Sequence, residues 1–330
     1  MTDFREKALE IIRNKTALVI CGGGVLGIAE CGALIQLEEL GLPFTNFTSV
    51  SGSSVGSILS TSVAGGGTST YLKKVLDSMD FNTFQDHDCF LRTAVQFIRK
   101  YGFNETTPIM NLAIKLLTDL GLDKDITFKQ LYDKTQVNMT LTYLSINYRR
   151  TMYANHVSEP DSLIREAIVK SSAIPLFYEA VIEGSGKNKM VNFDGGTANN
   201  YPLNIPKEQG VNPLYIIGLK LIASKEVDSI DNGGPGLPLV NEGPPKNSIE
   251  CLQILADILR RQALRMHVSD HDWQLTIKID IGKLSSTDFN LTKEQKEWLF
   301  NQGKKAVTNY VDELAKLLEE NKFVYYTMQQ

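Results

Sequence analysis

Residues 16–27 read Thr-Ala-Leu-Val-Ile-Cys-Gly-Gly-Gly-Val-Leu-Gly, an apolar run that ends in a glycine cluster. A short continuous apolar run bounded by glycines is typical of a buried strand that leads into a tight turn. Residues 28–40 follow with helical periodicity and stop at Gly41, a common residue just beyond a helix C-terminus. The stretch therefore predicts a buried strand, a glycine turn and a helix.

The same arrangement repeats immediately downstream. Residues 47–50 are a second short apolar segment, and residues 55–64 continue as a helical pattern that ends in three glycines. Strands that alternate with helices in this way indicate a parallel sheet. We therefore expect an α/β fold of three layers, α/β/α, with a mostly parallel central sheet and helices on both faces.

The rest of the chain extends this pattern. Residues 4–14 predict an amphipathic helix, residues 71–135 an α-rich insertion or lid, and residues 225–247, rich in Gly, Pro and Asp, a mobile loop. Further strands are expected at 137–148, 151–156, 214–222 and 273–281. Further helices are expected at 161–172, capped by Asp161 or Ser162, at 249–267, and from the cap Thr292 to about 321. Because strands are expected on both sides of the loop, residues 1–330 are predicted to form a single domain.

Composition narrows the function classes. The 330 residues carry a net charge of −4 and are 42% apolar, which is ordinary for a globular protein and gives no case for a nucleic-acid partner. The four scattered cysteines (Cys21, Cys31, Cys89, Cys251) indicate reduced thiols rather than disulfides or a metal site. The charged N-terminal segment contains no apolar core of signal-peptide length, and no apolar run reaches 18 residues. These features predict a cytoplasmic protein that could bind membranes peripherally.

Ser54 is the first candidate catalytic residue. It is the centre of Gly52-Ser-Ser-Val-Gly56, a G-x-S-x-G between a predicted strand and a predicted helix. In that setting a serine is exposed on a sharp turn, and the N-terminus of the following helix points at the reacting centre. Ser51 and Ser53 are not centred between the glycines, so we expect them to hydrogen-bond the turn.

The glycines at 22–27 allow two interpretations. Gly22-x-Gly24-x-x-Gly27 fits a dinucleotide-binding turn, but that motif needs an acidic residue at the end of the second strand, and Glu38 and Glu39 lie in the helix instead. The alternative is an oxyanion hole, in which the N–H groups of Gly22, Gly23 and Gly24 face a developing alkoxide. A nucleophile on the next strand favours the oxyanion hole.

Asp194 is the second catalytic candidate. It follows a short apolar segment and opens Asp194-Gly195-Gly196, a sequence that is also common in surface turns. A Ser-Asp-His triad with His267 or His271 is the main mechanistic alternative, since this chain order occurs in α/β-hydrolases. The same two histidines, with Asp270 and Asp272, could formally bind zinc. His87 and His156 are isolated and predicted to be structural or exposed.

The basic and apolar residues of 249–267 fit either a helix packed on the sheet, which we favour, or a helix on a lipid surface.

Together these segments resemble the patatin-like phospholipases over residues 16–222. Gly22–Gly27 resembles the glycine-rich oxyanion motif of that family, and Gly52–Gly56 its nucleophile elbow. Ser171-Ser-Ala-Ile-Pro175 is similar to its small-residue segment, and Asp194-Gly-Gly-Thr-Ala-Asn-Asn-Tyr-Pro202 to its Asp-Gly-Gly segment. The resemblance implies a Ser54–Asp194 dyad, an acyl-enzyme and calcium-independent hydrolysis of lipid esters. At Leu26 the family often has Arg or Lys instead. Without a basic side chain there, only backbone N–H groups remain as donors for the oxyanion.

The resulting hypothesis is a phospholipase A-type serine hydrolase without a metal or other cofactor, acting on lipid at a membrane or micelle surface. The motif glycines are Gly27, Gly52, Gly56, Gly195 and Gly196. The alternatives are a Ser-Asp-His esterase and a non-catalytic lipid-binding scaffold on the same fold.

Overall fold

The computed structural model describes residues 2–78, 100–223, 244, 251, 254–255, 268–286 and 288–327. The predicted loop at 225–247 and the predicted helix at 249–267 lie outside the described residues except for those isolated positions. His87, Cys89 and His267 also lie outside them.

A central sheet runs through the molecule in the order β10-β9-β1-β2-β4-β8-β7, with β5 paired to β4. The strands β10, β9, β1, β2 and β4 are mutually parallel, and β8, β7 and β5 add antiparallel pairs at one end. Their bounds are β1 Ala17–Ile20, β2 Ser49–Ser53, β4 Asn138–Ser145, β5 Arg150–Ala154, β7 Val181–Glu183, β8 Met190–Asp194, β9 Ile216–Ile222 and β10 Thr276–Asp280. A separate parallel pair joins β3 (Gly102–Asn104) to β6 (Leu176–Tyr178).

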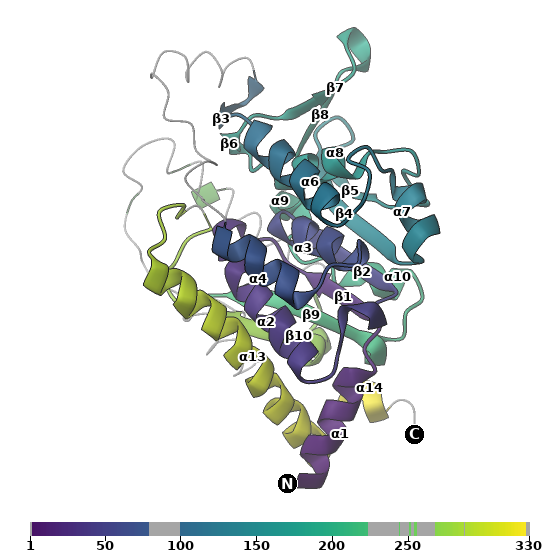
Figure 1. Cartoon of the computed structure of the whole chain (residues 1–330), viewed down its shortest axis with the longest axis vertical. Helices are drawn as coiled ribbons and strands as arrows, with labels where there is room; N and C mark the ends of the chain where they lie inside the picture. The colour runs from purple at the N-terminus through teal and green to yellow at the C-terminus, as the bar shows by residue number, and fades with distance from the viewer. Residues whose placement is uncertain are drawn as a thin grey trace.

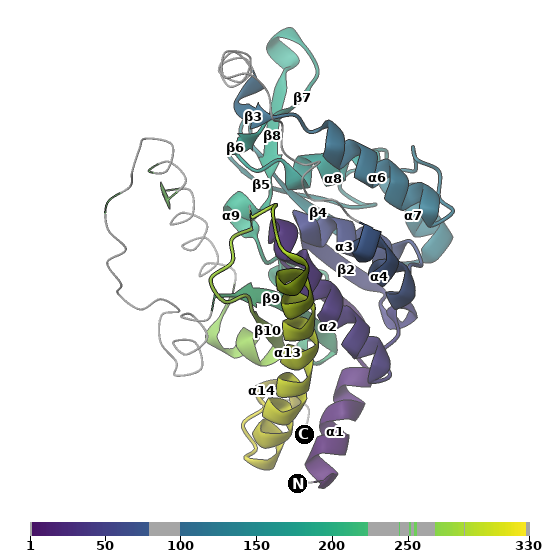
Figure 2. The ribbon, with the colours of Figure 1, turned by 60° about the vertical axis from the view of Figure 1, so that its left-hand side comes forward.

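Helices cover both faces of the sheet, so the predicted three-layer α/β/α architecture is confirmed (Figures 1 and 2). The longer ones are α1 Thr2–Arg13, α2 Gly27–Glu39, α3 Val55–Ala64, α4 Ser69–Ser78, α6 Thr107–Asp119, α7 Phe128–Thr135, α8 Ile164–Ser172 and α13 Lys293–Glu319. Short helices α9 (Gly196–Asn199), α10 (Asn204–Glu208), η6 (Asp270–Leu275) and α14 (Val324–Thr327) complete the described part.

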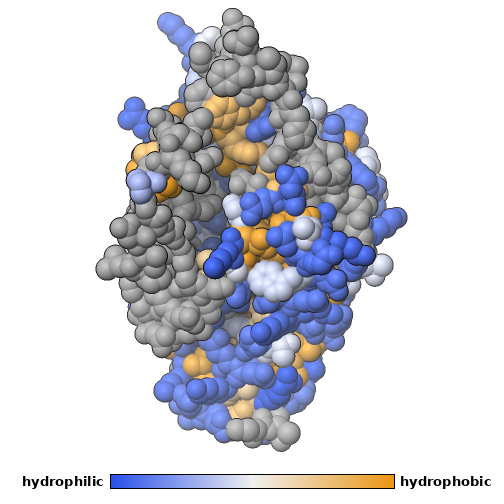
Figure 3. All heavy atoms as spheres, turned by 90° about the vertical axis from the view of Figure 1, so that its left-hand side faces the viewer, coloured by the Kyte–Doolittle hydropathy of each residue, from blue (hydrophilic) through white to orange (hydrophobic). Residues whose placement is uncertain are grey.

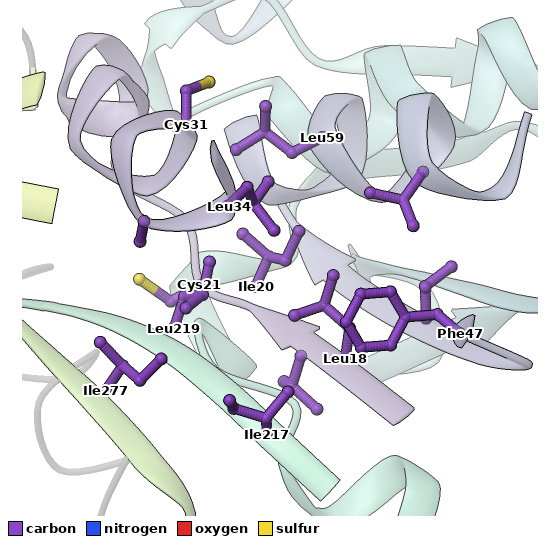
Figure 4. Packing of buried hydrophobic residues seen from close by; sticks show 14 of the residues in the cluster. Leu18, Ile20, Cys21, Cys31, Leu34, Phe47, Leu59, Ile217, Leu219 and Ile277 are labelled. Carbon is purple, nitrogen blue, oxygen red and sulfur yellow. The ribbon is translucent and has the colours of Figure 1, made fainter. Parts of the chain in front are cut away.

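The core forms where the apolar strands meet α2 and α3. Leu18 and Ile20 of β1 are fully buried, and their register partners in β9 are Ile217 and Leu219. Residues in register point to the same side of a sheet, so these four side chains form one apolar surface. Figure 4 shows Leu34 of α2 packed over that surface. Burial of this kind is the main favourable term in folding and fixes the positions of the loops that follow β1 and β2.

Strand β4 brings two distant chain segments together. Its residue Thr142 pairs with Ser53 of β2, and the next residue, Tyr143, pairs with Asp194 of β8. Because β5 occupies the opposite edge of β4, β2 and β8 share one edge. One runs parallel to β4 and the other antiparallel, so their carboxyl ends meet. Ser54, which directly follows β2, therefore lies beside Asp194.

Three predicted boundaries were wrong. Helix α8 begins at Ile164 because Ile164 N–H donates to Ile126 (3.1 Å) and the extended Leu163 bridges Thr127. The preceding residues form a turn, in which Ser162 N–H donates to the carbonyl oxygen of Glu159 (3.2 Å). The strand predicted at 273–281 begins at Thr276, since residues 270–275 form η6 behind a capping box of Ser269 and Asp272. The strand predicted at 47–50 is shifted and runs through Ser49–Ser53.

Candidate active site

Ser54 adopts the strained backbone expected of a nucleophile on a sharp turn. Its φ of 54° lies in the left-handed region, which non-glycine residues seldom occupy, and it is 5% exposed. A Cβ on Gly52 would lie 2.2 Å from the carbonyl oxygen of Gly56, and a Cβ on Gly56 would lie 2.4 Å from that of Ile20. Both motif glycines are therefore required by close backbone contacts, and the strained serine is held by its surroundings.

Hydrogen bonds hold this turn from both sides. The carbonyl oxygen of Ser54 accepts from the N–H (2.8 Å) and the hydroxyl (2.6 Å) of Ser57. The N–H of Ser54 donates to the hydroxyl oxygen of Ser171, at the end of α8, over 3.0 Å. Ser171 belongs to the small-residue segment of the sequence analysis, which gave it no function. Its position explains the segment, because its hydroxyl holds the backbone of Ser54, the candidate nucleophile.

Asp194 is held by the same segment. It is 4% exposed, and its N–H donates to the carbonyl oxygen of Ala173 over 2.8 Å. Its carboxylate accepts from the N–H of Gly196 over 2.5 Å, which fixes the orientation of the side chain. A Cβ on Gly195 would lie 2.4 Å from the carbonyl oxygen of Thr142, so this glycine permits β8 to end against β4.

The glycine loop lies directly over Ser54. A Cβ on Gly22 would lie 2.9 Å from Cβ of Ser54 and 2.3 Å from Oδ1 of Asn200, so only glycine fits there. The N–H of Gly22 donates to the Asn200 carbonyl oxygen (3.0 Å), and Nδ2 of Asn200 donates to the Gly22 carbonyl oxygen (2.9 Å). Asn200 thus joins the glycine loop to the loop after Asp194, a function that the sequence analysis missed although it quoted the residue.

Gly23 and Gly24 differ from Gly22 in their N–H groups. Within the described ranges, neither donates a hydrogen bond, whereas the N–H of Gly22 is already occupied. Gly24 has a φ of 54°, and a Cβ there would lie 2.2 Å from the carbonyl oxygen of Ser286. Leu26 is 2% exposed and part of the apolar core. The donors available at this loop are therefore two backbone N–H groups.

A deep apolar cavity opens beside Ser54. Its volume is about 110 Å³, and its lining is almost entirely apolar, as is typical of ligand pockets. Its walls come from α2, α3, α4 and α6, so the described part of the predicted insertion (71–135) forms one side of the site. The residues that line it include Ile28, Cys31, Val55, Ile58, Leu59, Leu72, Ile109, Leu112, Leu116, Ile174 and Phe289. Figure 3 shows apolar side chains gathered in a recess of one face, framed by hydrophilic residues.

The structure places His271 away from this site. Three strand spacings of about 4.8 Å separate β10 from β2. His271 lies in η6, which precedes β10, whereas Ser54 follows β2, so the two residues lie at opposite ends of these parallel strands. The neighbouring Asp272 accepts hydrogen bonds from Lys207 (2.8 Å) and Tyr325 (2.7 Å), so it is an ion-paired cap and not a metal ligand. Burial alone would raise the pKa of Asp272, but these donors hold it below its usual value.

The other described histidine is structural, as predicted. The ring of His156 stacks on Tyr132 with centroids 3.7 Å apart. Burial, helped by the nearby Lys129, lowers its pKa. In the described part of the chain, no three His, Cys, Asp or Glu side chains gather as a metal site would require.

A buried acid lies behind the glycine loop. Glu30 of α2 is fully buried and accepts from Sγ of Cys21 over 3.3 Å. Burial raises its pKa to about 8, so it is largely protonated at neutral pH. It does not line the cavity and packs against the sheet.

Comparison with known proteins agrees with this geometry. A sequence model of the family described as patatin-like phospholipase matches residues 18–206, more than half of the chain. The chain belongs to the patatin-like phospholipase family. The match includes the glycine loop, the Ser54 turn, the Ser171–Pro175 segment and the Asp194 loop.

The relatives of this chain differ in the share of their own length that the match covers. An uncharacterized protein, R571 of Acanthamoeba polyphaga mimivirus, is 26% identical over 90% of this chain and 94% of its own length. The uncharacterized protein YqhO of Bacillus subtilis is 25% identical over 87% of this chain and 94% of its own. Triacylglycerol lipase 5 of Saccharomyces cerevisiae is 30% identical over 49% of this chain, but the match spans only 22% of that protein.

The structural comparison supports the same fold. The crystal structure of VipD from Legionella pneumophila superposes with a TM-score of 0.57 at 15% identity, covering 91% of this patatin-like chain and 67% of VipD. As for membrane insertion, none of the helices among the described residues has the length and apolar character needed to cross a bilayer.

Proposed function

We propose that this protein is a lipid acyl hydrolase of phospholipase A type that cleaves carboxylic esters with a Ser54–Asp194 dyad. The observation that carries the proposal is the meeting of the carboxyl ends of β2 and β8, which brings the strained Ser54 beside Asp194 at the mouth of an apolar cavity. Membership in the patatin-like family and the triacylglycerol lipases among its relatives support lipid ester hydrolysis.

In the first half-reaction, Oγ of Ser54 attacks the ester carbonyl carbon while the carboxylate of Asp194 accepts the hydroxyl proton. The N–H groups of Gly23 and Gly24 donate to the oxyanion of the tetrahedral intermediate, and each such donor contributes about 3–4 kcal/mol in comparable sites. The N–H of Gly22 is occupied by Asn200, so Gly22 leaves space above Ser54 but donates no hydrogen bond to the oxyanion. The oxyanion hole expected from the sequence at Gly22, Gly23 and Gly24 is therefore reduced to Gly23 and Gly24. Collapse of the intermediate expels the alcohol, which takes the proton from Asp194, and leaves Ser54 acylated.

In the second half-reaction, Asp194 deprotonates a water that attacks the acyl-enzyme, and the same donors stabilise the second intermediate. The proton then returns to Oγ of Ser54 as the fatty acid leaves. A carboxylate is a weak base in water, so the reaction depends on the burial of Asp194 and on the apolar walls around Ser54. The N-terminus of α3 directly after Ser54 adds a favourable positive potential.

We propose that the acyl chain lies in the cavity between α3, α4 and α6 during both steps. No calcium enters this scheme, because Asp194 supplies the base and the backbone supplies the oxyanion donors. A single-domain organisation and a cytoplasmic, peripherally membrane-bound location remain predictions.

The central experiment compares Ser54→Ala and Asp194→Asn with Ser53→Ala. The Ser53 hydroxyl, like that of Ser51, was expected to hydrogen-bond the turn, but it is buried without a hydrogen-bond partner in the described structure. Ser53 is therefore a matched control one residue away. Hydrolysis of a short-chain nitrophenyl ester should fall by roughly 10⁴-fold or more in the two dyad variants and stay near wild type in the control. Full activity in either dyad variant would refute the mechanism. Absence of both turnover and fluorophosphonate labelling in the wild type would favour a non-catalytic lipid-binding scaffold.

Neutral glycerides are the second candidate substrate class, favoured by the relatives named as triacylglycerol lipases. A panel of phospholipids, lysophospholipids, galactolipids and triacylglycerols, with products identified by mass spectrometry, distinguishes the classes. The same assay in excess chelator tests the calcium-independent scheme, which predicts unchanged rates.

A further inference from the structure

Two turns meet at the end of the sheet farthest from β10. The β4–β5 turn (146–149) lies against the β7–β8 hairpin, because Asn147 donates to the carbonyl oxygen of Lys189 (3.0 Å) and accepts from the N–H of Val191 (2.8 Å). Lys189 also lies over the ring of Tyr101, 5.5 Å from its centroid. Figure 1 shows this hairpin projecting beyond the rest of the described chain. We call it the basic–apolar tip, composed of Tyr101, Ile146, Tyr148, Arg149, Arg150, Ile182, Lys187 and Lys189.

The apolar members of the tip are unusually exposed. Tyr148 is 61% exposed, Ile146 47%, Tyr101 44% and Ile182 37%. Ile146 N–H donates to the Val191 carbonyl oxygen, and Val191 is in register with Ile182, so residues from three strands or turns lie side by side. Scattered exposed apolar residues are normal, but a group gathered at a projecting end is characteristic of an interaction surface.

The charged members of the tip are all positive. Arg149, Arg150, Lys187 and Lys189 form no ion pair within the described ranges. Two acidic residues beside the tip are already paired, Glu179 with Lys100 (2.7 Å) and Glu183 with Lys170 (3.2 Å). The whole chain carries a net charge of −4, so this end is a local positive patch on an acidic protein.

We propose that the basic–apolar tip docks this enzyme onto anionic lipid bilayers. Cations attract the negative surface of such a bilayer, and exposed Tyr and Ile side chains can enter the headgroup region. A nucleic-acid partner would leave the isoleucines without a contact of matching chemistry. The inference rests on the proposed function, because it makes the bilayer the source of substrate.

The position of the tip supports this role. Strand β8 runs from the tip to Asp194 in five residues, about 16 Å at the usual rise per residue. Docking at the tip therefore holds the dyad close to the lipid surface while the end of the molecule with the two termini remains distant (Figure 2).

The test uses the full chain with Ser54→Ala, so that vesicles are not consumed, and measures co-sedimentation with phosphatidylcholine vesicles with or without phosphatidylserine. Adding Arg150→Gln and Lys187→Gln should weaken binding to the anionic vesicles about 25-fold, since each cation near such a surface contributes about fivefold. Lys293→Gln with Lys305→Gln, two exposed cations on α13, is the matched control and should bind like the parent.

Several results would overturn the proposal: no binding to anionic vesicles, equal binding to neutral ones, or equal losses in the tip and control variants. Hydrolysis of a soluble short-chain ester separates this inference from the proposed function. With Ser54 intact, the tip variant should retain wild-type rates on that ester. If Ser54→Ala failed to abolish ester hydrolysis, the dyad would be refuted while the vesicle result still decided the docking surface.

Discussion

Replacement of Ser171 by alanine tests how the nucleophile is held. The Ser171 hydroxyl accepts the N–H of Ser54 over 3.0 Å, and both residues are buried. Alanine removes the only acceptor of that N–H within the described structure and leaves a buried donor unpaired. Such a group costs about 1–3 kcal/mol. Ser54 already has a φ of 54°, so the turn can relieve the cost by relaxing toward an ordinary conformation.

If the full 1–3 kcal/mol is added to the activation free energy, kcat/KM falls by roughly 5- to 150-fold, since about 1.4 kcal/mol corresponds to a factor of ten. The assay is hydrolysis of a soluble nitrophenyl ester, together with the rate of fluorophosphonate labelling, which reports Ser54 directly. Both rates should fall by the same factor, because both depend on the orientation of Oγ.

Ser172→Ala is the matched control for this experiment. Ser172 is the next residue, buried, and its hydroxyl has no hydrogen-bond partner among the described residues. It should retain activity close to wild type. Thermal unfolding of both variants separates a local effect from loss of the fold. Wild-type labelling by Ser171→Ala, or an equal loss in Ser172→Ala, would show that this hydrogen bond does not orient the nucleophile.

Three other changes address the rest of the structure. Gly22→Ala should lower ester hydrolysis by about tenfold or more, because the added methyl would lie 2.3 Å from Oδ1 of Asn200 and must displace it or Ser54; wild-type kinetics would show that the loop yields freely. His271→Ala should leave kcat unchanged, whereas a thousandfold loss would restore the triad hypothesis. Burial lowers the pKa of Lys15 from 10.5 to about 7 in the folded protein. Between pH 7 and 10.5 the unfolded chain therefore binds one more proton at Lys15 than the folded protein, and the free energy of unfolding of the wild type rises with pH. Lys15→Met should abolish this component, which denaturant titrations at several pH values measure, and parallel pH profiles for the two proteins would contradict it.

Much of the first half of the fold could be predicted from sequence because its signals are local. The apolar run of β1, the glycines that follow and the ten residues of α3 each identify an element without tertiary information. The Thr292 cap likewise predicts the start of α13, where it accepts from the N–H of Gln295. These features depend on neighbours in the chain, which sequence patterns record directly.

One error arose where a contact between distant segments decides the local structure. Asp161 and Ser162 look like helix caps, yet they lie in a turn, and the hydrogen bond from Ile164 to Ile126 sets the start of the helix at Ile164. The short strands β3, β6 and β7 were not predicted, because three residues carry too little periodicity to be recognised. The functions of Ser171 and Asn200 were missed for the same reason, since each acts through a bond to a segment more than a hundred residues away.

The proposed dyad illustrates why the candidate residues themselves were nonetheless identifiable. A nucleophile and its base must lie close together. Here Ser53 pairs with Thr142 and Asp194 pairs with the next residue of β4, Tyr143, which brings Ser54 and Asp194 together. The segment at the end of α8 then fixes both backbones, by accepting from the N–H of Ser54 and from the N–H of Asp194. The sequence shows the small residues that such crowding requires, at Gly52, Gly195 and Ser171, but not the strand pairing that makes them necessary. The motifs therefore indicate where the site is too crowded for larger side chains, while the position of Ser54 relative to Asp194 follows from the register of β4 with β2 and β8.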